Sequence, residues 1–164
     1  MPDRLFVGVL GNRNSGKSTT WNSLFGTPVR TGSNARMLEL RRGECVEVFL
    51  ISGSPEERDI YAGDVLRSQT ARIILCSMQY VAHVIDTIDY VENEEFWSYV
   101  QWLNPGYSDE DVALADSMGI ANRLLYMGAT LAIRSGKVDP SSRVKELREF
   151  IYGWASFREL IVAC

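Results

Sequence analysis

The chain has 164 residues, of which 46% are hydrophobic and 23% are charged, and these values are ordinary for one globular domain with a substantial core. Its formal net charge of -4 argues against broad electrostatic binding of nucleic acid. The sequence has no apolar run of about 18 residues and no basic region leading into a long apolar stretch, so we expect neither a membrane span nor a secretory signal.

The first elements follow from an apolar run and the helix after it. Residues 5–10 are apolar without alternation, which predicts a strand buried on both faces of a parallel sheet. A helix is predicted over residues 17–25, and the Gly-Thr-Pro sequence at 26–28 ends it. Residues 27–35 are rich in Thr, Ser, Gly and Asn and therefore indicate a loop.

The middle of the chain predicts a hairpin, a helix and another strand. Strands are expected over residues 36–41 and 45–51, joined by an Arg-Gly-Glu turn. A helix over 56–68 follows, with acidic residues in its first turn, and then a strand over 72–80. Residues 80–103 are ambiguous, because their apolar positions lie near helical spacing while the first part could begin extended. We favour a helix there by Glu92, ended by the Asn-Pro-Gly sequence that follows Leu103.

The last third alternates again. We expect a short strand at 112–114, a helix through Tyr126, a strand over 130–133, a Ser-Gly-Lys loop at 135–137 and a final helix opening at Asp139-Pro140. Apolar residues of that helix recur at steps of three and four, as an amphipathic helix requires. Strands alternating with helices predict one domain over residues 1–164, a three-layer α/β/α sandwich around a mostly parallel sheet.

The three cysteines offer no metal site, since no Cys-x-x-Cys or His/Cys pattern accompanies the single histidine, His83. Cys45, Cys76 and Cys164 lie far apart, two of them in apolar, strand-like runs. We therefore expect buried free thiols in a reducing compartment and a cytoplasmic protein.

The strongest motif joins the first strand to the first helix, where the sequence GNRNSGKS has the complete Walker A spacing. Gly11 permits a turn directly off the strand, and the backbone N–H groups that follow form a nest for phosphate oxygens at a helix N-terminus. Lys17 is suited to the outer phosphates and the Ser18 hydroxyl to Mg²⁺. The residues predicted to bind the nucleotide are Gly11, Asn12, Arg13, Asn14, Ser15, Gly16, Lys17, Ser18 and Thr19.

Residues 7–26 resemble the first strand, P-loop and first helix of the translation-factor-like GTPases, especially the Era, EngA and MnmE group. That group has G-x-P-N-V-G-K-S followed by N-x-L-x-G, and Asn14, Gly16, Lys17, Ser18, Asn22, Leu24 and Gly26 hold the corresponding positions. Arg13 and Ser15 stand where proline and valine are common. The resemblance implies a P-loop fold, Mg²⁺ and GTP or GDP as ligand, with ATP as an alternative. It also suggests that Asn14 helps to hold a monovalent cation.

Two motifs of that family are missing. Ser52-Gly53-Ser54-Pro55 replaces the D-x-x-G motif that follows the third strand, which leaves three nearby acidic residues (Glu56, Glu57 and Asp59) to reach a metal through water. The guanine-reading N-K-x-D motif keeps only Asp116, which would either accept hydrogen bonds from guanine or be a solvated residue at a helix start. The Ser-Gly-Lys sequence at 135–137 stands where the family has Ser-Ala-Lys. Thr31 or Ser33 could be the switch residue that reaches Mg²⁺, and either could equally be part of an ordinary polar loop.

Catalysis would need an oriented water and neutralisation of developing charge. Lys17 and Arg13 are the catalytic candidates, Arg13 as an internal arginine finger or, alternatively, as a residue that points to solvent. Gln69 and Gln79 could orient water, although nothing in the sequence places them near the loop. We therefore expect hydrolysis to be slow or to depend on a partner.

Three functional hypotheses remain: a divergent GTPase-like hydrolase, a nucleotide-binding scaffold without hydrolysis, and a small ATP-using enzyme. The aromatic residues bear on the partners. Trp97, Tyr99, Trp102 and Tyr107 form one group, and Trp154 and Phe157 form another. If exposed, either group could anchor a protein partner or a second copy of the chain, and if buried, both are core.

Overall fold

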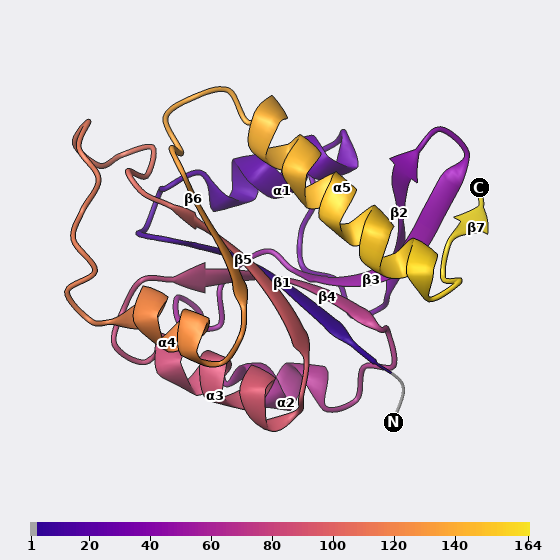
Figure 1. Ribbon diagram of the computed structural model, residues 1–164, viewed down its shortest axis with the longest axis horizontal. Helices are drawn as coiled ribbons and strands as arrows, with labels where there is room; N and C mark the ends of the chain where they lie inside the picture. The colour runs from indigo at the N-terminus through magenta and orange to yellow at the C-terminus, as the bar shows by residue number, and fades with distance from the viewer. Residues whose placement is uncertain (1–2) are drawn as a thin grey trace.

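The computed structural model describes residues 3–164, which form an α/β structure of seven strands and five helices (Figure 1). The strands are β1 (Leu5–Gly11), β2 (Arg36–Arg41), β3 (Glu44–Ile51), β4 (Ile73–Gln79), β5 (Trp97–Leu103), β6 (Thr130–Arg134) and β7 (Val162–Ala163). The helices are α1 (Lys17–Phe25), α2 (Ala62–Leu66), α3 (Val84–Asn93), α4 (Ile120–Tyr126) and α5 (Ser141–Phe157).

All seven strands belong to one mixed, mostly parallel sheet, in which six follow the order β2-β3-β4-β1-β5-β6 and the seventh, β7, pairs with β3. Strands β3, β4, β1, β5 and β6 run parallel, whereas β2 and β7 pair with β3 in the antiparallel direction. Strand β1 is central and wholly buried, as its uninterrupted apolar run predicted. The chain leaves β1 toward β3 on one side and leaves β5 toward β6 on the other, so a crevice opens at the carboxyl ends of β1 and β5.

Helices cover both faces of the sheet (Figure 1). Helices α1 and α5 pack on one face, where Trp21 and Leu24 meet the apolar stripe of α5. Helices α2, α3 and α4 pack on the other face over a second buried cluster. The predicted α/β sandwich with a mostly parallel sheet is therefore confirmed. None of the helices in residues 3–164 combines the length and the apolar character that a membrane crossing requires.

The first helix ends as its sequence predicts. Gly26 adopts a left-handed φ of 71°, and its backbone N–H caps the carbonyls of Asn22 and Ser23. The Asn22 side chain then accepts a hydrogen bond from the backbone N–H of Val29 at 2.9 Å. Asn22 therefore fixes the path of the loop that follows the helix.

The helix favoured between Glu92 and Leu103 is wrong, because that segment is divided between α3 and the strand β5. Glu95 has a φ of 58°, which separates the two elements. The apolar residues of β5 lie near helical spacing, but β5 pairs with β1 on one side and β6 on the other, and most of its residues are buried on both faces of the sheet. The sequence fits a helix and a buried strand almost equally well, and pairing with neighbouring strands decides for the strand.

Two further elements are shorter than predicted or missing. The helix expected over 56–68 is reduced to α2, since Asp59 has a φ of 52° that a right-handed helix cannot accommodate. The strand expected at 112–114 is absent, because the backbone of Leu114 is hydrogen-bonded to the Asn104 side chain instead. The Leu114 N–H donates to Asn104 Oδ1 at 2.7 Å, and the Leu114 carbonyl accepts from Asn104 Nδ2 at 2.8 Å. The short strand β7 was not foreseen.

The prediction of free thiols is wrong for two of the three cysteines. Cys45 and Cys164 form a disulfide across a sequence separation of 119 residues, because β7 returns to the edge of β3. Only Cys76 is free, and it is buried in β4. With Cys45 and Cys164 joined, the cysteines no longer indicate a reducing compartment.

Candidate functional site

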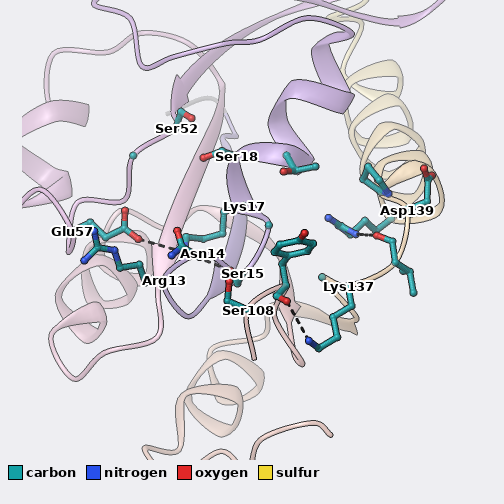
Figure 2. Close-up of a pocket in the computed structure, with 18 residues that line it drawn as sticks. Arg13, Asn14, Ser15, Lys17, Ser18, Ser52, Glu57, Ser108, Lys137 and Asp139 are labelled. Carbon is teal, nitrogen blue, oxygen red and sulfur yellow. Dashed lines mark hydrogen bonds and ion pairs between the residues drawn. The ribbon is translucent and has the colours of Figure 1, made fainter. Parts of the chain in front are cut away.

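A cavity of about 790 Å³ lies at the carboxyl ends of the strands. Figure 2 shows the side chains that line it. Its lining comes from five segments. They are residues 13–19; Ser52, Gly53 and Glu57 after β3; Tyr107 and Ser108 after β5; residues 136–140 after β6; and Arg143 in α5. Each segment follows a different strand of the sheet or begins a helix. The topology of a parallel sheet brings such segments together, and this is where α/β proteins commonly bind ligands.

The centre of the cavity wall is the 11–18 loop, the segment from Gly11 to Ser18. The loop turns sharply, because Asn14 has a φ of 57° and Gly16 a φ of 107°. A Cβ on Gly11 would lie 2.3 Å from Ser15 Oγ, so the turn off β1 requires glycine at that position. The backbone N–H groups of residues 16–19 donate to no backbone acceptor within residues 3–164, as expected for the first turn of a helix. Free backbone donors and the N-terminal dipole of a helix are both features that favour an anion.

Lys17 lies at the floor of this loop and is only 6% exposed. Its ammonium donates to the carbonyl oxygens of Gly11 and Asn12, at 3.2 and 2.8 Å, and lies 3.6 Å from a Glu57 carboxylate oxygen, a pair that Figure 2 marks with a dashed line. Burial lowers the pKa of Lys17, and the Glu57 carboxylate partly offsets this shift. The lysine is therefore a buried cation whose only direct ion pair within residues 3–164 is with a cavity-lining carboxylate.

Neighbouring loops are fastened to the 11–18 loop by backbone hydrogen bonds. The N–H groups of Tyr107 and Ser108 donate to the carbonyls of Ser15 and Asn14, at 2.9 and 3.1 Å. Gly136 packs so closely that an added Cβ would lie 2.0 Å from the carbonyl oxygen of Ser15. The loops after β1, β5 and β6 therefore form one connected wall.

The structure brings together most of the residues predicted from the motif. Arg13, Asn14, Ser15, Gly16, Lys17, Ser18 and Thr19 all line the cavity. Gly11 and Asn12 do not line it but support it from behind. The Asn12 amide donates to both carboxylate oxygens of Asp109, at 3.3 and 3.2 Å, and Asp109 in turn accepts from the Gly106 N–H at 2.8 Å.

Asp116 lies away from the cavity, and its carboxylate is already engaged. It accepts hydrogen bonds from the backbone N–H groups of Ile120 and Ala121, both at 2.9 Å, and from the Tyr80 hydroxyl. Burial alone would raise the pKa of Asp116, but these hydrogen bonds outweigh it and lower the pKa. The carboxylate therefore serves the start of α4, which was the alternative to base recognition.

Thr31 does not line the cavity either. Its hydroxyl accepts hydrogen bonds from the backbone N–H groups of Ser52 and Gly53, at 2.8 and 3.4 Å. Because Ser52 and Gly53 do line the cavity, Thr31 supports the segment after β3. Ser33, Gln69 and Gln79 also lie outside the lining.

Of the three acidic residues considered after β3, only Glu57 reaches the cavity. Glu56 is buried and turns away, accepting from the backbone N–H of Gln79 at 2.9 Å and from the Thr87 hydroxyl at 3.2 Å, and burial raises its pKa. Asp59 is exposed outside the lining. Glu57 and the Ser18 hydroxyl both line the cavity and offer oxygen atoms of the kind that bind Mg²⁺.

The aromatic groups divide between core and surface. Tyr99, Trp102 and Trp154 are buried, whereas Trp97 and Phe157 are exposed. Tyr107 is 67% exposed and lines the cavity, a role that the sequence analysis did not assign to it.

Arg143 is a lining residue that the sequence analysis missed. A signal was present, since Arg143 lies four residues before Leu147 and eight before Ile151 on the buried stripe of α5. A charged side chain on the apolar face of an amphipathic helix is unusual enough to mark a site.

Comparisons with protein families, curated proteins and solved structures find no match to this chain. The chemistry of the site therefore follows from its own geometry.

Proposed function

We propose that the chain binds the phosphate groups of a nucleoside diphosphate or triphosphate at the 11–18 loop, together with Mg²⁺. The observation that carries the proposal is the convergence of the free N–H groups of residues 16–19, the buried Lys17 ammonium and the Ser18 hydroxyl on one cavity. A volume of about 790 Å³ lies within the range of roughly 300–1,000 Å³ typical of small-molecule sites.

In this proposal each residue has a distinct task. The N–H groups of residues 16–19 hold phosphate oxygens, and Lys17 exchanges its bonds to loop carbonyls for bonds to the ligand. Mg²⁺ would neutralise phosphate charge, held by Ser18 and approached by Glu57. Arg13 is exposed at the cavity wall, where it can reach a terminal phosphate.

The proposed activity is divergent, GTPase-like hydrolysis that is slow or depends on a partner. Strand β4 lies between β1 and β3, and the segment after β3 contributes a single carboxylate, Glu57, to the described cavity lining. Within the described lining, Glu57 is paired with Lys17 and Asp139 with Ser141, so neither carboxylate is free to orient water. The engagement of both carboxylates also favours a second candidate function, a nucleotide-binding scaffold that does not hydrolyse its ligand.

A competition series tests the proposal. Fluorescent GTP and ATP analogues are titrated with Mg²⁺ and then displaced by unlabelled nucleotides and pyrophosphate, and phosphate release is measured in parallel. Saturable binding that pyrophosphate displaces supports the phosphate site, and preference for GDP and GTP over ATP supports the GTPase-like branch. Turnover equal to background despite binding selects the scaffold. No affinity for any nucleotide or for pyrophosphate would overturn the proposal.

Glu57→Gln is expected to have opposite effects with and without Mg²⁺. Without the metal, removal of a negative charge beside Lys17 should tighten GDP binding by up to about fivefold, since a partly exposed pair is worth at most ~1 kcal/mol. With Mg²⁺ the gain should shrink or reverse, because the metal loses an oxygen donor. The measurement is calorimetric titration in EDTA and in Mg²⁺, with Asp59→Asn as a control outside the cavity lining. Equal affinities for wild type and Glu57→Gln in both buffers would contradict the assignment.

A further inference from the structure

Arg143, the third residue of α5, carries a buried charge that is in direct contact with no carboxylate of residues 3–164. The residue is only 3% exposed, and its guanidinium forms no ion pair with any carboxylate of residues 3–164. Burial lowers its pKa, and the more distant Asp139 only partly opposes this. A buried and unpaired cation is costly for a folded protein, so its presence calls for a function.

The hydrogen bonds of the guanidinium leave one end open. Nε donates to the Thr20 hydroxyl at 3.1 Å, and Nη1 donates to the carbonyls of Ser135 and Val138 at 3.3 and 3.2 Å. Nη2 has no protein acceptor within residues 3–164, yet it is not among the buried polar atoms without a partner. Because Arg143 lines the cavity, the exposed part of this side chain faces that space.

The position of the open end is defined by Gly16. A Cβ built on Gly16 would lie 3.3 Å from Arg143 Nη2, so this nitrogen lies against the 11–18 loop at the start of α1. The Lys17 ammonium, in contrast, contacts Gly11, Asn12 and Glu57 and shares no hydrogen-bond partner with Arg143. The two cations therefore approach the loop from different sides.

The guanidinium is also held in place from behind. The backbone carbonyl of Arg143 accepts a hydrogen bond from the buried amide of Gln101 at 2.8 Å, which ties the first turn of α5 to the central strand β5. A charged donor fixed in advance loses little conformational entropy when it binds an anion.

We propose that Arg143 binds a second phosphate group, so that the cavity is built for two linked phosphates, one held by Lys17 and the other by Arg143. This inference rests on the proposed phosphate site and names a binding residue outside the motif that revealed the site. A diphosphate offers one phosphate group to each cation, whereas a single phosphate offers a group to only one of them.

The test compares pyrophosphate with inorganic phosphate by calorimetric titration on wild type, Arg143→Met and Arg143→Lys. Pyrophosphate affinity should fall about tenfold or more in Arg143→Met, while inorganic phosphate affinity should change less than twofold. Arg143→Lys should lie between them, because it keeps the charge and loses the planar fork. Arg148→Met is the matched control on the same helix, since Arg148 donates to the Leu24 carbonyl and does not line the cavity.

Thermal unfolding without ligand separates a binding role from a structural one. If Arg143 binds phosphate, Arg143→Met should bind pyrophosphate more weakly and yet unfold near the wild-type temperature or above it. The stability should be kept because the substitution removes an unpaired buried charge. Unchanged pyrophosphate affinity in folded Arg143→Met would overturn the inference, and so would equal losses for both anions. If Arg143→Met does not fold, unchanged pyrophosphate affinity in Arg143→Lys overturns it equally. Wild-type protein that binds neither anion would instead refute the proposed function itself.

Discussion

Lys17→Met is expected to weaken nucleotide binding by about 100-fold or more. The ammonium is buried and contacts the floor of the 11–18 loop, so its removal takes away charge-assisted hydrogen bonds worth about 1.5–3 kcal/mol each. Each 1.4 kcal/mol corresponds to about a tenfold change in affinity. Methionine keeps the length and the apolar stem of lysine, which limits the effect on folding. Titration of a fluorescent GTP or ATP analogue measures the loss.

The matched control is Lys145→Met, because Lys145 is an exposed lysine of α5 outside the cavity lining. It should bind as wild type does. Binding by Lys17→Met within about threefold of wild type would show that the lysine does not touch the ligand.

The same lysine gives the binding a pH dependence. Because burial lowers the pKa of Lys17, its ammonium loses the proton at a lower pH than an ordinary lysine does. Affinity should therefore be full below the lowered pKa and should fall as the pH rises through it. In Lys17→Met this alkaline decline should disappear.

Gly136→Ala is expected to damage both the fold and the site. Its Cβ would lie 2.0 Å from the carbonyl oxygen of Ser15 and 3.0 Å from the backbone nitrogen of Tyr107. Both neighbours are backbone atoms that cannot rotate away, so the loops after β1, β5 and β6 must separate. We expect a loss of roughly 1–3 kcal/mol in the free energy of unfolding, as for an overpacked core, and more than a tenfold loss of nucleotide affinity. Urea unfolding and ligand titration measure the two effects.

Gly153→Ala is the control, since Gly153 lies within α5 and an added Cβ would meet nothing within 4 Å. Alanine in a helix interior is better than glycine by roughly 0.5–1 kcal/mol, so this variant should be slightly more stable and should bind normally. Wild-type affinity in Gly136→Ala would show that the close contact with Ser15 does not shape the site.

The parts of the structure that the sequence predicted are those with strong local signals. The apolar run of β1, the glycine-rich turn after it and the Gly26 cap of α1 are local chemistry, and each formed as expected. Strand β5 was missed because its apolar residues fit a helix and a doubly buried strand equally well. Only pairing with β1 and β6 distinguishes the two structures, and pairing is not local.

The site was predictable to the same extent. Residues 13–19 line the cavity as the motif indicated, whereas Asp116 and Thr31 are occupied by backbone N–H groups of α4 and of the segment after β3. Either side chain could bind a ligand or support a neighbouring backbone segment, and in the structure both support the backbone. Arg143 is 126 residues from Lys17 in the chain, and no spacing rule connects them, although its place on the apolar stripe of α5 was a usable signal.

The disulfide between Cys45 and Cys164 has a mechanical consequence. It closes residues 45–164 into a covalent ring, and a pull between residue 3 and Cys164 can stretch only the part of the chain before Cys45. That part extends to about 150 Å at ~3.5 Å per residue, against about 570 Å for the reduced chain. The 11–18 loop lies in the extensible part, while the other cavity segments lie within the ring. Tension would therefore pull the 11–18 loop away from the loops after β5 and β6, which stay within the covalent ring.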